Sequence, residues 1–349
     1  MKSAACRNSY TSQRGHWATQ TLACHCQAYC TAPLNVYSMQ NRAAFEKWRL
    51  AMSSVALSEA VHHVPATARP LSPREIAAFE RDGYVVVPGM FTNEEICPLR
   101  DACLADPTVG GRLRAVADSS GNAQDVIGWT EFSNDYVGVI PRISRLIAGA
   151  QSLLGKPSYH WHSKLSMKAP HTAGRWDWHQ DYPYWYDEGC LWPDMLTAMI
   201  AVDRITQQNG CVKLVKGSHL LGRVNHVPIG EANGCDPERL DLIMKQLPTV
   251  PVELEPGDVC FFHANALHAS GANESDFPRT ILHCSYNTIE NSPFIEEGQE
   301  HHRYKPFTTL PDSVLADRLW DTVFTNHRFN GTTGDGKKNS YGYKIISRK

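Results

Sequence analysis

Two histidines and one carboxylate have the residue types and the spacing that could bind a metal ion. His179 and Asp181 are two residues apart, and in an extended strand side chains at i and i+2 point the same way. His268 comes right after a predicted strand, in the segment HASGAN (268–273). Two histidines and a carboxylate make the facial triad of non-haem Fe(II) oxygenases, which leaves coordination positions open for a co-substrate and O₂. The three residues therefore predict an iron centre.

Arg279 adds a second functional group. It lies eleven residues past His268 and opens the next predicted strand. A guanidinium could bind the far carboxylate of a 2-oxo diacid through a bidentate, charge-assisted pair. These residues together fit iron with 2-oxoglutarate better than zinc-dependent hydrolysis. His263 competes with His268 as the third ligand, and the Ser-Gly-x-Asn context after His268 favours His268.

The elements around these residues change from helix to strand along the chain. Ser72 and Thr92 each open a capping box, which predicts helices over 73–82 and 93–105, the second with Pro98 inside it. An apolar helical pattern predicts a further helix over 137–154. Strands are predicted over 84–87, 158–168, 196–202, 211–215, 249–254, 259–263 and 280–288, and the long connection 221–248 carries a helical piece at 237–245. Helices followed by many short strands predict an α+β fold with a β-barrel or jelly-roll core.

The composition excludes several classes of protein. The 349 residues carry 34 Lys and Arg against 36 Asp and Glu, which gives no support to nucleic-acid binding or to a polybasic membrane protein. No stretch approaches the ~18 consecutive apolar residues of a membrane span. The 11 cysteines stand mostly alone in apolar runs, which favours buried, reduced thiols in an intracellular protein.

The N-terminal segment has an unusual composition. Residues 1–45 contain no Asp or Glu and are rich in Ser, Thr, Ala and Gln, as in a transit peptide. The alternatives are a disordered extension or a later start at Met39 or Met52. Cys24–Cys30 is dense in Cys and His, but it lacks the second ligand pair of a structural zinc site. We expect a cytoplasmic protein, with the mitochondrion as the alternative location.

Several segments together resemble the phytanoyl-CoA dioxygenase (PhyH) family of Fe(II)/2-oxoglutarate-dependent oxygenases. These segments agree with that family in type, order and spacing over roughly residues 71–290. They are His179-Gln180-Asp181, Asn209-Gly210-Cys211, Lys216-Gly217-Ser218-His219, Gly257 to His263, His268 to Asn273, and Arg279. Ala269 departs from the family, which often has Gly at this position, but the change is small.

The resemblance implies a double-stranded β-helix, a cupin-like jelly roll, flanked by N-terminal helices. It implies iron bound by His179, Asp181 and His268, and 2-oxoglutarate held by Arg279, Ser270 and Lys168. The enzyme would use O₂ to hydroxylate a small organic substrate while 2-oxoglutarate is decarboxylated to succinate and CO₂. Related halogenases carry a small residue in place of the carboxylate, so Asp181 implies hydroxylation or desaturation.

The aromatic residues beside the first metal motif suggest a substrate cavity. Tyr182 and Trp185 are the candidates for its wall, whereas His160 and His162 are expected to pack beside the site rather than bind the metal. Two rival functions remain open: a cupin-like metalloenzyme that does not use 2-oxoglutarate, and a non-catalytic binding protein on the same scaffold. We expect an N-terminal extension over 1–70, a catalytic domain over 71–310, and a tail over 311–349 that packs on or beside it.

Overall fold

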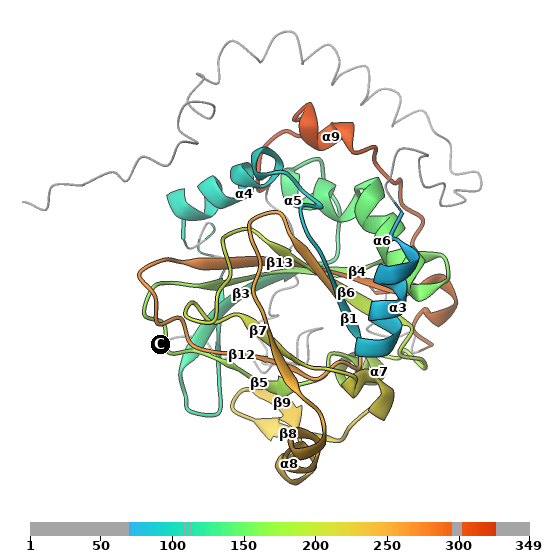
Figure 1. The fold of residues 1–349 in the computed structure, drawn as a ribbon. Helices are drawn as coiled ribbons and strands as arrows, with labels where there is room; N and C mark the ends of the chain where they lie inside the picture. The colour runs from blue at the N-terminus through green and yellow to red at the C-terminus, as the bar shows by residue number, and fades with distance from the viewer. Residues whose placement is uncertain (1–69, 108, 110, 112, 295–301, 326–349) are drawn as a thin grey trace, which may run out of the picture. The chain divides into compact units, whose positions relative to one another are not determined.

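Two antiparallel sheets face each other in the computed structural model (Figure 1). The structure describes residues 70–107, 109, 111, 113–294 and 302–325. The chain divides between Ala56 and Leu57, and every described residue belongs to the C-terminal unit. Residues 1–69 of the expected N-terminal extension, with Cys24–Cys30, lie outside the described residues, as does 326–349 of the expected tail.

The larger sheet has seven strands and the smaller sheet has four. Their orders are β1-β11-β6-β13-β4-β3-β2 and β10-β7-β12-β5. The larger sheet consists of β1 (Tyr84–Val87), β2 (Arg114–Ala117), β3 (Ala123–Trp129), β4 (Ser158–Lys168), β6 (Met195–Ala201), β11 (Val259–His263) and β13 (Arg279–Thr288). The smaller sheet consists of β5 (Trp176–His179), β7 (Val212–Val215), β10 (Thr249–Val252) and β12 (His268–Ser270).

The path of the chain identifies the fold. From β4 to β7 and again from β10 to β13, successive strands alternate between the two sheets. This winding makes a double-stranded β-helix, so the predicted α+β jelly-roll core is confirmed. An apolar cluster fills the space between β6, β7, β10 and β11, and it includes Met199, Leu214, Val252, Cys260 and Phe262. The polar interior described below therefore lies toward β4 and β5.

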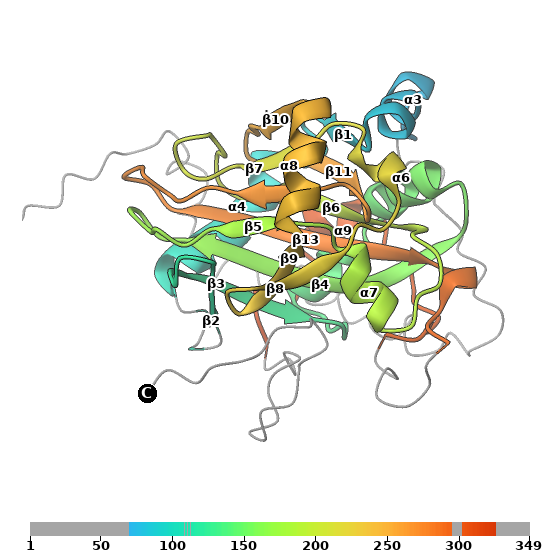
Figure 2. The same cartoon turned by 90° about the horizontal axis from the view of Figure 1, so that it is seen from below.

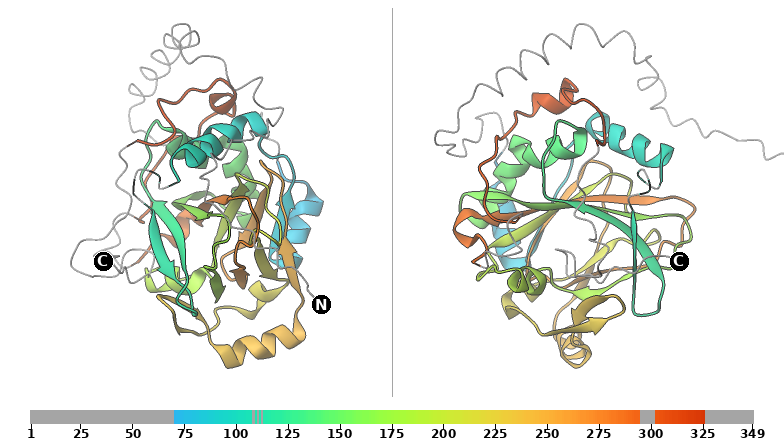
Figure 3. Two further views of the ribbon diagram at one scale, coloured as in Figure 1. Left: turned by 90° about the vertical axis from the view of Figure 1, so that its left-hand side faces the viewer. Right: turned by 180° about the vertical axis from the view of Figure 1, so that it is seen from behind.

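Helices cover the outer face of the larger sheet (Figures 1 and 3). They are α3 (Pro73–Asp82), α4 (Asn93–Ala105), α5 (Tyr136–Val139), α6 (Ser144–Leu154) and the short α9 (Ser313–Ala316). The predicted capping boxes at Ser72 and Thr92 are both formed, and α4 continues through Pro98. Gly149 of α6 lets the helix approach the sheet, because an added Cβ would lie 2.8 Å from the Phe261 ring.

The other side of the fold carries a hairpin and a helix (Figure 2). The hairpin pairs β8 (His226–Ile229) with β9 (Ala232–Cys235), and α8 (Pro237–Gln246) follows it. The sequence predicted α8 but not the hairpin, which falls in the connection expected over 221–248. Buried Val215, Cys235 and Ile243 join β7, β9 and α8 in one apolar cluster. The remaining elements are α7 (Tyr182–Asp187) and the 3₁₀ turns η1 (Ile140–Arg142), η2 (Ser218–Leu221) and η3 (Ile289–Asn291).

The single helix expected over 137–154 is wrong. The chain instead forms α5, η1 and α6, with Ile143 extended at φ −66° and ψ 135° between η1 and α6. Pro141 lacks the N–H that would continue the hydrogen bonding of α5, although Ile140 before it keeps helical backbone angles. The break has a tertiary partner, because the Ser144 N–H donates to the Leu310 carbonyl at 2.9 Å. The C-terminal segment thus docks where the helix stops.

Three further features bear on the sequence predictions. The described cysteines, from Cys97 to Cys284, are all buried and free. No helix in the described ranges is long and apolar enough to cross a bilayer. Beyond Leu310, the Thr322 carbonyl accepts from Tyr136 N at 2.8 Å, so this part of the C-terminal segment contacts α5.

Candidate active site

The predicted metal ligands lie together between the two sheets. The candidate ligand atoms of His179, Asp181 and His268 lie within 4.8 Å of one another, and all three residues are buried. Asp181 Oδ1 is 3.9 Å from Nε2 of each histidine. The register of β5 with β12 places His268 opposite His179, with ring centroids 4.1 Å apart. Within the described part of the chain, this is the one His, Cys, Asp or Glu cluster with the spacing of a metal site.

The hydrogen bonds of the two imidazoles fit a divalent metal. His179 Nδ1 lies 2.7 Å from the Asp177 carbonyl, and His268 Nδ1 lies 3.0 Å from the Ala266 carbonyl. A carbonyl can only accept, so both Nδ1 atoms carry the proton and both Nε2 lone pairs face Asp181. Burial lowers the pKa of both histidines, which keeps them neutral as metal binding requires.

Asp181 is held by one oxygen and presents the other. β5 ends at His179, and Asp181 already has the helical backbone of α7, at φ −73° and ψ −35°. The extended geometry from which the spacing of His179 and Asp181 was interpreted therefore holds for His179 but not for Asp181. Thr197 Oγ1 donates to Asp181 Oδ2 at 3.3 Å, which leaves Oδ1 facing the imidazoles. Burial acts to raise the pKa of Asp181, but the neighbouring imidazoles and Lys164 outweigh it and lower the pKa.

Gln180, between the two ligands, has a structural task. Its Nε2 donates to the carbonyls of Gly222 and Asn265 at 2.8 and 2.7 Å. Its Oε1 accepts from the Val224 N–H at 2.8 Å. The side chain is fully buried and bonds to segments other than the triad, so it fixes the turn that carries both candidate ligands.

The residues expected to hold 2-oxoglutarate also meet. Arg279 of β13 lies opposite Lys168 of β4, and Lys168 Nζ donates to Ser270 Oγ at 2.9 Å and to the Gly271 carbonyl. Arg279 is 1% exposed, yet its Nε and Nη2 have no hydrogen-bond partner among the described residues. Burial, and next the positive charge of Arg279, lower the pKa of Lys168 to about 6. A buried guanidinium with unused donors, beside a desolvated lysine that an anion would help to protonate, fits an anionic ligand.

Comparison with known proteins decides the family. The family model of phytanoyl-CoA dioxygenase (PhyH) matches residues 79–281, more than half of the chain. This chain belongs to the PhyH family. Ectoine dioxygenase of Bordetella bronchiseptica is 28% identical over 238 residues, which cover 64% of this chain and 77% of that protein. L-Proline trans-4-hydroxylase of Streptomyces griseoviridis is 26% identical over 262 residues, covering 69% and 95%.

Solved structures agree with this assignment. EctD from S. alaskensis with bound Fe has a TM-score of 0.57 at 25% identity, covering 73% of this chain and 92% of that chain. The same protein with 2-oxoglutarate and 5-hydroxyectoine has a TM-score of 0.56 at 27% identity, covering 72% and 91%. The PhyH chain is therefore a non-haem Fe(II)/2-oxoglutarate-dependent oxygenase, whose cofactor is iron and whose co-substrates are 2-oxoglutarate and O₂.

The other histidines singled out from the sequence lie elsewhere in the PhyH fold. His263 Nδ1 accepts from the Asn265 N–H at 3.0 Å, and its ring lies 6.1 Å from Phe79 of α3. His160 Nε2 bonds to Ser163 Oγ at 2.8 Å, and its ring lies 4.9 Å from Phe132. His162 alone of the three is linked toward the triad, through Ser285 Oγ at 3.5 Å.

The two expected substrate residues differ in their surroundings. The Tyr182 hydroxyl donates to the Leu191 carbonyl at 2.5 Å, so its polar end is occupied by its own loop. The Trp185 ring lies 5.9 Å from His162, edge to face. Contact with a substrate stays a prediction for both residues. Sequence reasoning missed Thr197 and Lys164 in this site, because a threonine or a lysine in a strand carries no local sign of what it faces.

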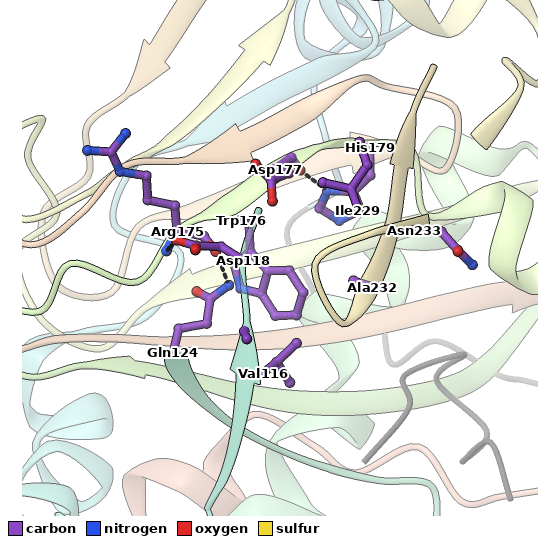
Figure 4. A pocket seen from close by; sticks show the side chains of 11 residues that line it. Val116, Asp118, Gln124, Arg175, Trp176, Asp177, His179, Ile229, Ala232 and Asn233 are labelled. Carbon is purple, nitrogen blue, oxygen red and sulfur yellow. Dashed lines mark hydrogen bonds between the residues drawn. The ribbon is translucent and has the colours of Figure 1, made fainter. Parts of the chain in front are cut away.

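A pocket opens beside the triad (Figure 4). It lies between β2 and β3, β5, and the hairpin β8–β9, and His179 and Trp176 form part of its wall. Gln124 donates from Nε2 to the Arg175 carbonyl at 2.7 Å along one side. The hairpin contributes Ile229, Ala232 and Asn233, and the Tyr184 hydroxyl of α7 donates to the Asn233 carbonyl. The hairpin missed from the sequence therefore borders the metal site of this PhyH enzyme.

Proposed function

We propose that His179, Asp181 and His268 bind Fe(II), that Arg279, Ser270 and Lys168 bind 2-oxoglutarate, and that the enzyme hydroxylates a small organic substrate. The observation that carries this proposal is the buried Arg279 guanidinium, whose Nε and Nη2 have no partner among the described residues. A buried donor without a partner costs free energy, and a ligand carboxylate would supply that partner. A binding protein without catalysis would not need this arrangement beside a three-ligand metal site.

Each side chain has a defined task in this reaction. Iron, when bound, supplies the oxidising chemistry of O₂ activation, coupled to conversion of 2-oxoglutarate to succinate and CO₂. The carbonyls of Asp177 and Ala266 hold the imidazoles of His179 and His268 in the ligand tautomer. Thr197 holds one oxygen of Asp181, so the carboxylate offers the metal a single oxygen.

The co-substrate residues orient a dianion. Arg279 and Lys168 sit on paired strands, and Ser270 faces them from the other sheet. They would bind the carboxylate far from the metal, which places the 2-oxo end of the ligand at the triad. Relatives named for ectoine and for L-proline support a substrate of similar size. An intact Asp181 supports hydroxylation rather than halogenation.

An anaerobic titration tests these roles. Adding 2-oxoglutarate to the Fe(II)-loaded protein should give a visible charge-transfer absorption, because the facial triad leaves coordination positions open for this ligand. Arg279→Met should weaken 2-oxoglutarate binding at least about tenfold, because a charged hydrogen-bond partner is lost. Arg204→Met is the control, since the Arg204 side chain is 70% exposed. His179→Ala and Asp181→Ala should each abolish the absorption and succinate formation.

Two results would count against the proposal. Equal affinity for 2-oxoglutarate in Arg279→Met and Arg204→Met would remove Arg279 from the co-substrate site. Full absorption after loss of His179 or Asp181 would remove that residue from the metal site. A screen of small metabolites that measures succinate release would then identify the substrate.

A further inference from the structure

A second lysine of β4 points into the interior of the barrel. Lys164 is four residues from Lys168, and the pairing of β4 with β13 is regular between them. Side chains at even spacing share one face of a strand, so Lys164 shares the face on which Lys168 reaches Ser270. Its partner on β13 is His283 and its partner on β3 is Gly128, which has no side chain.

The ammonium of Lys164 lies near an aromatic ring and is in no ion pair with a described residue. It lies 5.7 Å from the ring centroid of Trp176, on the opposite sheet. It forms no hydrogen bond and no ion pair with any residue that the structure describes. The residue is half-buried, so it is partly removed from water with no contacting carboxylate. Such a charge is costly unless another group pairs with it.

The acids of the interior are divided among its cations. The charge of Asp203 acts on Arg279, and the charge of Asp118 acts on Lys168. Asp181, a proposed metal ligand, is the one described acid whose charge acts appreciably on Lys164. The remaining groups that face Lys164 are the imidazoles, such as His283 opposite it on β13. Lys164 therefore shares its one acidic neighbour with the proposed metal site and has no described carboxylate to itself.

We propose that Lys164 binds a carboxylate of the substrate. This inference rests on the proposed function, in which both carboxylates of 2-oxoglutarate are already assigned, one to Arg279, Lys168 and Ser270 and the other to the metal. A further anion in the same interior must then come from the substrate. Trp176 would pack against the aliphatic stem of the lysine and limit the directions in which its ammonium can point. The substrate class is thus a small organic acid or amino acid rather than an uncharged or cationic molecule.

The first experiment separates the substrate from 2-oxoglutarate as the source of the anion. Lys164→Met keeps the length of the side chain and removes its charge, and Lys213→Met replaces an exposed lysine as the matched control. In the anaerobic titration, both variants should bind 2-oxoglutarate within about twofold of the wild-type protein. A loss of at least about tenfold in Lys164→Met alone would assign the lysine to 2-oxoglutarate and overturn the proposal. If the wild-type protein shows no 2-oxoglutarate-dependent absorption, the proposed function fails instead.

The second experiment probes the anion site without the natural substrate. Crystals of the Mn(II)·2-oxoglutarate complex soaked in sodium bromide should show an anomalous peak beside the Lys164 ammonium. The peak should persist in Lys213→Met and vanish in Lys164→Met. No peak in the wild-type crystals would overturn the proposal. A substrate from the succinate screen that lacks an anionic group would overturn it as well.

Discussion

Replacing Lys168 by methionine should change how the stability of the metal-free protein depends on pH. Lys168 is 1% exposed, and burial together with Arg279 lowers its pKa to about 6 from the ordinary 10.5. An unfolded chain keeps the ordinary value. Between these two values the unfolded chain therefore binds about one proton more than the folded protein.

The sign follows from this difference in bound protons. Stability rises with pH wherever the unfolded state binds more protons, by at most about 1.4 kcal/mol per pH unit for one group. The Lys168 contribution is therefore least favourable at acid pH, and it improves as pH rises through 6 toward 10.5. Integrated from about pH 6 to about pH 8, the change amounts to about 2 kcal/mol.

Urea unfolding of the metal-free protein measures this effect. Lys168→Met removes the titration. The free energy of unfolding of this variant, minus that of the wild-type protein, should therefore be about 2 kcal/mol higher near pH 6 than near pH 8, so the variant gains stability relative to the wild-type protein at the lower pH. Lys213→Met, at an exposed position of β7, should show no such difference between the two pH values. If Lys168→Met and the wild-type protein differ by the same amount at both pH values, the ammonium is not desolvated as the structure indicates. Loading with Fe(II) and 2-oxoglutarate should shrink the difference, because a carboxylate would then pair with Lys168.

Three other predictions use different parts of the site. Thr197→Val should weaken Fe(II) binding by about 10- to 100-fold in an anaerobic titration, and Thr197→Ser should restore it; equal affinity in all three proteins would contradict the role given to this hydroxyl. Gly210→Ala should lower the free energy of unfolding more than Gly217→Ala, because both have φ near 80° but only at Gly210 would a Cβ lie 2.5 Å from the Gly271 carbonyl. Gly149→Ala should cost about 1–3 kcal/mol through overpacking against Phe261, and Phe261→Leu should relieve part of that cost.

Local signals in the sequence predicted the elements that depend on local interactions. The start of the helix at Pro73 is set by the reciprocal hydrogen bonds of the Ser72–Glu75 capping box. The two residues are three positions apart in the sequence, so this signal is local. The strand β1 was predicted with its observed bounds, since Gly83 ends the helix and Pro88 follows the strand. The candidate ligands His179, Asp181 and His268 were chosen from their types and from the segments around them, whereas the register that pairs His268 with His179 comes from the structure.

Features that depend on distant partners could not be predicted in the same way. The break at Ile143 is completed by Leu310, which lies more than 160 residues further along the chain. The early end of β5 at His179 depends on contacts such as the hydrogen bond from Tyr182 N to the Ala264 carbonyl at 3.0 Å. The hairpin β8–β9 is held beside the site by Tyr184, through a hydroxyl that no sequence pattern connects to Asn233. Each of these features is set by tertiary packing rather than by local propensity.

The two lysines of β4 show that sequence can locate a site more easily than it can distinguish the roles of the residues in that site. Lys164 and Lys168 share one face of the same strand, so periodicity treats them alike. Their difference arises across the sheets: Lys168 meets Arg279 and Ser270, whereas Lys164 meets His283 and Trp176. The neighbours of Lys168 include a guanidinium and fit one carboxylate of a dianion. The neighbours of Lys164 leave its positive charge near the candidate metal ligands. Strand pairing, which sequence spacing alone does not encode, therefore separates the surroundings of the two lysines, and on this difference we assign Lys168 to the co-substrate and Lys164 to the substrate.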